Sequence, residues 1–251
     1  MRKPSLSPSK ITTYLACPVK YRWTYVDARG RFYLRAKSVY SFGTTLHRVL
    51  ERFHDSNDAG VTTTEQAVAA LEEGWIEAGY SSLQEMQEAL GEGKAIVAAY
   101  MEEVRLAPSA ATTLYVEKAL TLDMGAWNLI GRVDRVDEHE DGTLEIVDYK
   151  TGRSEVSEDD VRHDLAMACY QLMLRSMHPD RPVLASIVAL RSGQKATAAL
   201  SDEEAAEFRH DLDFIGGEIL SREYDMITPV RKPLCEHCDF IALCRKHEEF
   251  G

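Results

Sequence analysis

Apolar and polar residues alternate along three stretches in the middle of the chain, residues 114–124, 128–138 and 143–149. An alternation of period two predicts β-strands that bury one face. Glu140-Asp141-Gly142 is a turn signal between the last two stretches. The pattern therefore predicts an antiparallel meander of three strands.

Apolar residues at helical spacing occur on both sides of this meander. Leu46, Val49, Leu50 and Phe53 follow the i, i+3, i+4, i+7 pattern, which predicts a helix that begins after Gly43. Similar patterns predict further helices over residues 7–15, 62–105 (two or three helices, with a break at residues 91–93), 157–178 and 201–223, and strands over 183–190 and 195–200. Mixed strands and helices in this order predict an α/β fold.

Length and composition describe a globular chain. The 251 residues can form one large domain or two small ones. Hydrophobic residues make up 45% and charged residues 28%, which excludes a disordered chain. No stretch approaches the roughly 18 apolar residues of a membrane span, and the basic residues 1–10 are not followed by the apolar region of a secretory signal. We expect a cytoplasmic protein with no membrane partner.

Charge is distributed unevenly along the chain. The net charge is −12, a sign that opposes binding to nucleic acid. Residues 1–37, however, hold nine basic residues and one acidic residue, so this segment carries +8 and the remainder −20. A basic strip on an acidic protein predicts local phosphate binding. The alternative is a basic segment that is merely solvated.

Candidate chemistry lies at the ends of two predicted strands. Asp148 and Lys150 are two residues apart and so project from one strand face. If the preceding hairpin is centred on Asp141, residue i faces residue 282 − i, which places Asp134 opposite Asp148. Two close carboxylates favour a divalent cation such as Mg²⁺ or Mn²⁺. The alternative is a structural ion-pair group of these three residues with Arg135.

These motifs resemble a known family of nucleases. Gly131-Arg132-Val133-Asp134-Arg135, a short hairpin and Asp148-Tyr149-Lys150-Thr151-Gly152 are similar to the core of the PD-(D/E)XK nuclease superfamily, in its RecB-like branch. The resemblance implies a restriction-endonuclease-like α/β core with a mixed central sheet flanked by helices. It also implies that His47, in Gly43-Thr44-Thr45-Leu46-His47, completes a metal site with Asp134, Asp148 and the carbonyl of Tyr149, and that Lys150 assists catalysis.

Further residues are assigned to substrate binding. The family carries glutamine and, four residues later, tyrosine on the next helix. Tyr170 fits the tyrosine, but Ala166 stands at the glutamine position and the nearest glutamine is Gln171. We also predict contacts to DNA from Arg135 and from Lys10, Lys20 and Arg22 of the basic strip.

The cysteines suggest a second metal centre. Cys235, Cys238 and Cys244 crowd one end of the sequence, Cys17 lies near the other, and Cys169 is in mid-chain. In a reducing compartment such cysteines are ligands or core residues rather than disulfides. Four of them resemble the 4Fe-4S ligands of the RecB-like iron-sulfur nucleases: Cys17, Cys235, Cys238 and Cys244. This resemblance implies a clasp that joins the termini. The alternative is zinc bound by the three late cysteines with His237, His247 or Cys17.

Together these features predict a single nuclease domain over residues 1–251. The clasp takes residues 1–42 and 225–251, a helical insertion 43–113 and the nuclease core 114–224. The resemblance implies a metal-dependent deoxyribonuclease, an exonuclease on single-stranded ends or overhangs. CRISPR adaptation, with integrase proteins as partners, is the first expectation for its role. The alternatives are a stand-alone repair exonuclease, with or without another repair subunit, and a non-catalytic iron-sulfur DNA-binding module.

Overall fold

The structure is a computed structural model that describes residues 3–55, 60–152 and 155–250. The chain divides into two compact units. Unit 1 comprises residues 1–35, 123–130 and 207–251, and unit 2 comprises residues 36–122 and 131–206. Assignment of the whole chain to a single domain stays a prediction. Within the described residues, no helix is long and apolar enough to cross a membrane.

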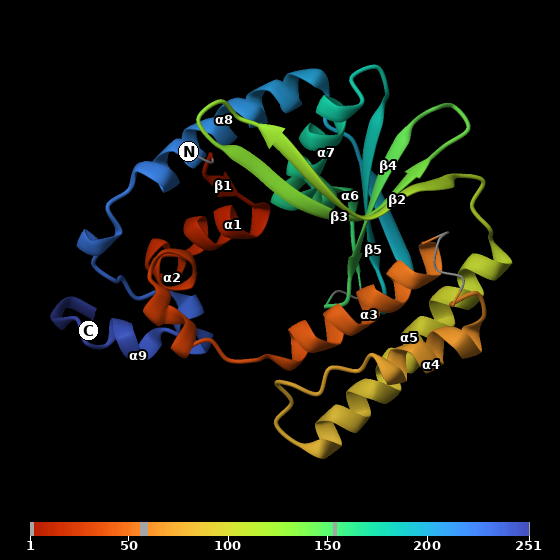
Figure 1. Ribbon diagram of the computed structural model, residues 1–251, viewed down its shortest axis with the longest axis horizontal. Helices are drawn as coiled ribbons and strands as arrows, with labels where there is room; N and C mark the ends of the chain where they lie inside the picture. Colours follow the sequence, from red (N-terminus) through yellow and green to blue (C-terminus); the bar gives the residue numbers. More distant parts are fainter. Residues whose placement is uncertain (1–2, 56–59, 153–154, 251) are drawn as a thin grey trace. The chain divides into compact units, whose positions relative to one another are not determined.

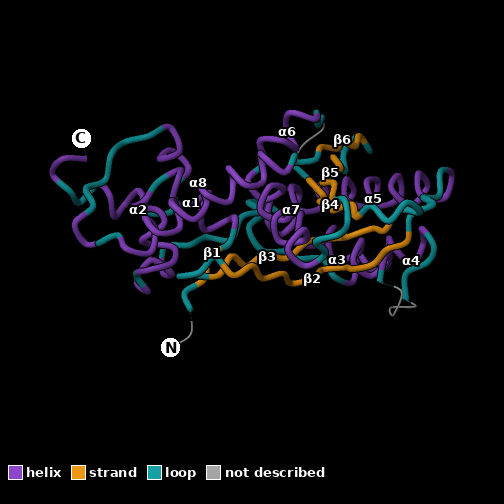
Figure 2. Tube along the Cα trace, turned by 90° about the horizontal axis from the view of Figure 1, so that it is seen from above, coloured by secondary structure: helices purple, strands orange, loops and turns teal. Residues whose placement is uncertain are grey.

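A mixed β-sheet forms the centre of unit 2 (Figure 1). Strand β3 pairs with β2 on one side and antiparallel with β4 on the other, β4 pairs parallel with β5, and β5 pairs antiparallel with β6. The strands are β2 (Thr112–Asp123), β3 (Asn128–Glu138), β4 (Leu144–Lys150), β5 (Val183–Ala189) and β6 (Gln194–Ala198). Strands β2 and β3 run side by side in both views (Figures 1 and 2).

Three helices cover one face of this sheet: α3 (Ser38–His54), α4 (Thr64–Glu73) and α5 (Leu83–Leu106). Their apolar stripes bury Leu46, Leu71 and Val97 against Val147 and Tyr149 of β4. On the other face, α6 (Glu158–His163) is followed by α7 (Leu165–Met177), which contacts β4 and β5. Residues 144–149 are all buried, as expected for a strand covered on both faces. The α/β fold with a mixed sheet flanked by helices is confirmed.

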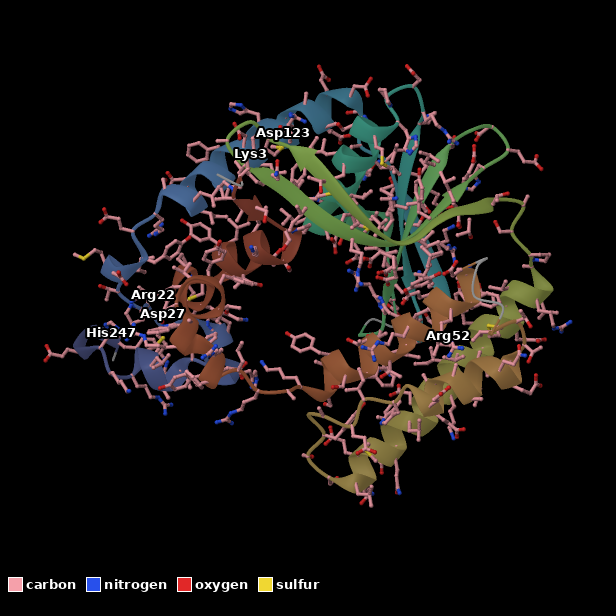
Figure 3. All side chains as sticks on the ribbon, in the orientation of Figure 1. Lys3, Arg22, Asp27, Arg52, Asp123 and His247 are labelled. Carbon is pink, nitrogen blue, oxygen red and sulfur yellow. The ribbon has the colours of Figure 1, made fainter. Side chains whose placement is uncertain are left out.

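Unit 1 gathers the two ends of the chain. Strand β1 (Ser5–Leu6) pairs parallel with the first residues of β3, and helices α1 (Pro8–Ala16) and α2 (Pro18–Tyr21) follow it. Helix α8 (Asp202–Ser221) begins in unit 2 and continues in unit 1, where α9 (Ile241–Cys244) lies near the end of the chain. Ion pairs within the unit include Lys3 with Asp123, 2.7 Å apart (Figure 3).

The buried ring of Trp127 explains why residue 216 in unit 1 is a glycine. Its indole Nε1 donates to Asp213 of α8 at 3.2 Å. A Cβ atom on Gly216 would lie 2.4 Å from the indole ring, so α8 can pass over Trp127 only with glycine at this position.

Three predicted helix boundaries are wrong. The helix predicted after Gly43 begins at Ser38. Helix α5 continues through residues 91–93, because Gly93 packs closely against Leu71 and Trp75, and such packing overrides a propensity cost of about 1 kcal/mol per glycine. The helix predicted over 157–178 is divided at Asp164, whose carboxylate accepts the N–H groups of residues 166 and 167 as the N-cap of α7.

Candidate active site

The hairpin of β3 and β4 has the predicted register. Arg135 pairs with Val147 and Val136 with Ile146, and each pair of numbers sums to 282. One further pair in the same register sets Asp134 opposite Asp148. As predicted, Asp148 and Lys150 share a strand face, and the Lys150 Nζ lies 2.8 Å from Asp148 Oδ2.

Helix α3 brings His47 to this hairpin. Its Nε2 lies 2.9 Å from the carbonyl oxygen of Tyr149, and its Nδ1 lies 3.3 Å from Asp134 Oδ1. The backbone N–H of Tyr149 in turn donates to Asp134 Oδ2 at 2.9 Å. The peptide groups on either side of Tyr149 therefore bind both His47 and Asp134, which joins the helical and strand parts of the site.

Glu117 of β2 is a member of this group that sequence reasoning missed. His47, Glu117 and Asp134 each offer a ligand atom, and these atoms all lie within 4.8 Å of one another. Glu117 has φ 46°, the one positive φ of a non-glycine residue in the described chain. The inward and outward alternation of β2 changes phase just beyond it, as at a β-bulge. Such strain is often found at functional sites, but no periodicity in the sequence reveals it.

The electrostatics of the site suit a cation. Burial, opposed by Lys150 and reinforced by the charge of Asp134, raises the pKa of Asp148 to about 6. Burial and Asp134 also raise the pKa of Glu117. Carboxylates whose charged forms are disfavoured by burial and by each other gain from a divalent cation. The donors, carboxylate oxygens and an imidazole, fit Mg²⁺ or Mn²⁺.

The same acids favour the charged forms of His47 and Lys150. Burial alone would lower the pKa of each, but the hydrogen bond and charge of Asp134 raise that of His47, and Asp148 raises that of Lys150. Lys150 is therefore an ammonium at neutral pH. Neutral imidazole is the metal-binding form of His47, so a cation must compete with its proton.

A cleft of about 590 Å³ opens over these groups. It is lined by His47, Glu117 and Lys150 of the site and by Tyr40, Arg48 and Arg132, among others. The Arg132 Nε lies 2.6 Å from Glu117 Oε2. The cleft thus combines two candidate metal ligands, His47 and Glu117, with arginines able to bind phosphate.

Tyr170 also lies close to the acids of the site. Burial, followed by the charges of Asp148 and Asp134, raises the pKa of its hydroxyl. A Cβ atom on Gly131 would lie 2.7 Å from the Tyr170 ring, which explains that glycine of the motif. Gln171 instead accepts the N–H of Leu200 at 2.9 Å and is buried, so it does not replace the missing glutamine. Asp164, 3.9 Å from the Lys150 Nζ, is a nearby acid that the sequence analysis did not single out.

Four residues predicted to contact DNA are not among those that line the cleft: Arg135, Lys10, Lys20 and Arg22. Arg135 is turned to the α3–α5 side of the sheet, where 12% of its side chain is exposed. Lys10, Lys20 and Arg22 belong to unit 1. Arg22 donates to the carbonyl of Tyr224 and to Asp225 and lies near Asp27 (Figure 3). Lys10 donates to the carbonyl of Ser5. Their contacts to DNA stay predictions.

Four cysteines gather in unit 1. Cys235 and Cys244 are buried in one apolar cluster, and Cys17 packs against it. Burial, then the charges of Cys238, Cys17 and Cys235, raises the pKa of Cys244 to about 11. Sequence-distant thiols are thus brought near one another, whereas Cys169 is buried in α7 of unit 2.

Comparisons with known proteins concern the fold and the family of the chain. A crystal structure of a candidate exonuclease from Eubacterium rectale matches with a TM-score of 0.51 and 12% identity, over 98% of this chain and 89% of that one. At this identity the likeness shows the fold alone. The crystal structure of SSO0001 covers 83% of this chain and 96% of that one at 13% identity, with a TM-score of only 0.35. No curated protein matches the sequence significantly.

A sequence profile of one family covers both units. It describes the PD-(D/E)XK nuclease superfamily and matches residues 5–245. Nucleases of this superfamily use divalent metals, and a group of His47, Glu117 and Asp134 with the atoms to ligate one is present in this chain. The chain belongs to the PD-(D/E)XK nuclease superfamily.

Proposed function

We propose that the chain is a Mg²⁺- or Mn²⁺-dependent deoxyribonuclease. The observation that carries this proposal is the convergence of α3, β2, β3 and β4 on one cleft. Ligand atoms of His47, Glu117 and Asp134 lie within 4.8 Å of one another. The Lys150 ammonium lies 2.8 Å from the buried carboxylate of Asp148, which is on the same strand, β4.

The environment of each residue defines its task. His47, Glu117, Asp134 and Asp148 would hold the cation, with the Tyr149 carbonyl beside them. The cation would supply Lewis acidity toward a phosphodiester oxygen and lower the pKa of a water molecule. Lys150 carries three N–H donors and no acceptor, so it orients the attacking water or stabilises negative charge on the phosphate but does not take up a proton. Asp148 holds that ammonium in place.

Cleavage of DNA with and without metal tests the proposal. The wild-type chain should cleave labelled DNA with Mg²⁺ or Mn²⁺ and lose this activity with a chelator. Lys150→Ala and Asp134→Ala should abolish cleavage and leave the circular dichroism spectrum unchanged. Asp159→Ala, which removes an exposed acid of the same unit, is the matched control. Metal-dependent cleavage that persists in both site variants would place the active site elsewhere.

We further propose that the substrate is a single-stranded end or overhang, as in prespacer processing during CRISPR adaptation. The resemblance of the motifs to RecB-like nucleases supports this. Short duplexes with 3′ or 5′ overhangs should be trimmed to the duplex boundary. Complete degradation of long duplexes would instead favour the repair exonuclease. Co-purification with integrase proteins of a CRISPR locus tests the partner.

We also propose that Cys17, Cys235, Cys238 and Cys244 hold a structural 4Fe-4S cluster. Backbone N–H groups of Lys20 and Lys232 donate to the sulfurs of Cys17 and Cys235, both at 3.4 Å, and such bonds are typical of cluster thiolates. A tetrahedral zinc site would hold its sulfurs about 4 Å apart. Among the residues that the structure describes, only the His47 group brings three ligand atoms within 4.8 Å of one another, and we therefore favour the larger cluster over zinc for these thiols.

A further inference from the structure

Arg135 follows Asp134 directly, yet its side chain faces the opposite side of the sheet. Its guanidinium is buried among polar partners. Nη1 lies 2.6 Å from His54 Nε2, 2.9 Å from the Tyr100 hydroxyl and close to the Tyr149 hydroxyl, so these three acceptors share its two N–H groups. Nε donates to Asp137 Oδ2 at 3.0 Å. One side chain therefore joins β3, β4, α3 and α5.

The elements that it joins are those that carry the candidate site. His54 lies seven residues after His47 and thus on the same face of α3. Tyr149 lies between Asp148 and Lys150 on β4. The Arg135 side chain contacts Tyr149 at its hydroxyl and not at its carbonyl, so it acts on the candidate ligands through the elements that present them.

Tyr149 is the route from the guanidinium to the ligands. Its hydroxyl is held by Arg135 and by Tyr100, the latter at 3.0 Å, and the guanidinium lies 5.6 Å from its ring centroid. Its N–H donates to Asp134 and its carbonyl faces His47, both at 2.9 Å. The anchored hydroxyl restrains the position of the Tyr149 side chain and, through its Cα, of the backbone N–H and carbonyl that contact Asp134 and His47.

The protonation states of this network are also fixed. Arginine only donates, so Nε2 of His54 must be the unprotonated nitrogen. Burial, and then the charge of Arg135, lowers the pKa of His54 to about 3, which keeps the imidazole neutral at physiological pH. The one guanidinium charge is balanced by Asp137, whose carboxylate also accepts the hydroxyl of Thr113.

We propose that Arg135 is a positioning residue for the divalent cation: it holds Tyr149 and α3 so that His47 and Asp134 keep a geometry able to bind metal. This inference rests on the proposed metal site and replaces the DNA contact predicted for Arg135. Residues that act behind metal ligands typically change metal affinity by about 10- to 100-fold.

Mn²⁺ titration in the absence of DNA tests the proposal independently of cleavage. Arg135→Lys keeps the charge but loses the planar fork of donors, and it should weaken Mn²⁺ binding about 10-fold or more. Tyr149→Phe removes only a hydroxyl and should weaken Mn²⁺ binding in the same direction by less. Arg181→Lys is the control, because Arg181 binds Glu138 and the Gly142 carbonyl at the other end of the hairpin. All variants are compared below their measured melting temperatures.

DNA affinity separates positioning from direct contact. Measured in the presence of a chelator over a range of salt, the affinity and salt dependence of Arg135→Gln, which removes the charge, should equal those of Arg181→Gln. Wild-type Mn²⁺ affinity in Arg135→Lys and Tyr149→Phe overturns the proposal. So does a weaker, less salt-dependent DNA complex, which would reveal a phosphate contact. If the wild-type chain binds Mn²⁺ but cleaves no DNA, the proposed function fails while the role of Arg135 stands.

Discussion

Two buried acids of β4, Asp148 and Glu145, differ in how folding treats their charge. Glu145 accepts from Ser186 and lies 2.5 Å from the Lys195 Nζ and 2.9 Å from His139 Nε2. These partners overcome burial and lower its pKa. Asp148 has Lys150 but also the charge of Asp134, and its pKa is raised to about 6. The buried acid whose charge is fully paired stabilises the fold, whereas the acid whose charged form is disfavoured marks a candidate functional site.

The largest expected effect on cleavage comes from replacing each of these two acids by its amide. Asp148→Asn should reduce cleavage by more than about 100-fold because it removes a ligand and the partner of Lys150. Its metal-free melting temperature should stay the same or rise, since a disfavoured charge is removed. Glu145→Gln should cleave DNA normally below its melting temperature. Equal losses of activity in both variants would contradict the distinction.

The cysteines allow a second comparison, between the four that gather in unit 1 and Cys169 of unit 2. Protein purified without oxygen should be brown, with about four irons and four sulfides per chain. Cys17→Ser should lose the iron and melt at a lower temperature, because structural metal binding is coupled to folding. Cys169→Ser, which changes a buried thiol of unit 2, should keep the iron.

Metal analysis of the same preparations decides between the two kinds of centre. One zinc per chain without sulfide would replace the cluster by a zinc clasp. Iron retained in Cys17→Ser would remove Cys17 from the ligand set.

Glu117 should behave like Asp148, with a smaller effect. Its pKa is raised by burial and by Asp134. Glu117→Gln should weaken Mn²⁺ binding by about 10-fold and should not lower the metal-free melting temperature. Calorimetric titration and thermal melting measure the two quantities. A destabilised variant with unchanged Mn²⁺ affinity would show that Glu117 is structural.

The smallest effect concerns the pH dependence of unfolding. Since folding lowers the pKa of Glu145 from its usual 4.5, its contribution to stability is present above pH 4.5 and is lost as the pH falls through the lowered value. Glu145→Gln should cost about 1–2 kcal/mol at pH 7, and urea unfolding should show this difference vanish under strongly acidic conditions. A constant difference at every pH would assign the loss to packing.

The sequence predicts those parts of the site that depend on local periodicity. The turn at Asp141 determines the register, and the register determines that Asp134 faces Asp148. Arg135 lies two residues from the buried Val133, so strand alternation predicts that both side chains face the interior. An arginine within a nuclease motif nevertheless suggests a contact to DNA. Gly93 is a feature that local periodicity does not predict. Its packing partners, Leu71 and Trp75, are distant in sequence, and only this tertiary packing explains the unbroken helix. Glu117 depends on a backbone conformation that no pattern of residue types encodes.

The left-handed backbone of Glu117 bears on attempts to make this protein more heat-resistant. A non-glycine residue in this conformation costs on the order of 1–2 kcal/mol, so a search for thermostable variants should readily select glycine at position 117. Such a variant would be more stable to unfolding and yet lack the carboxylate that lies within 4.8 Å of the ligand atoms of His47 and Asp134. Selection for thermostability alone would therefore drive the chain away from metal binding at this position, and selection for stability should be paired with a screen for Mn²⁺ affinity.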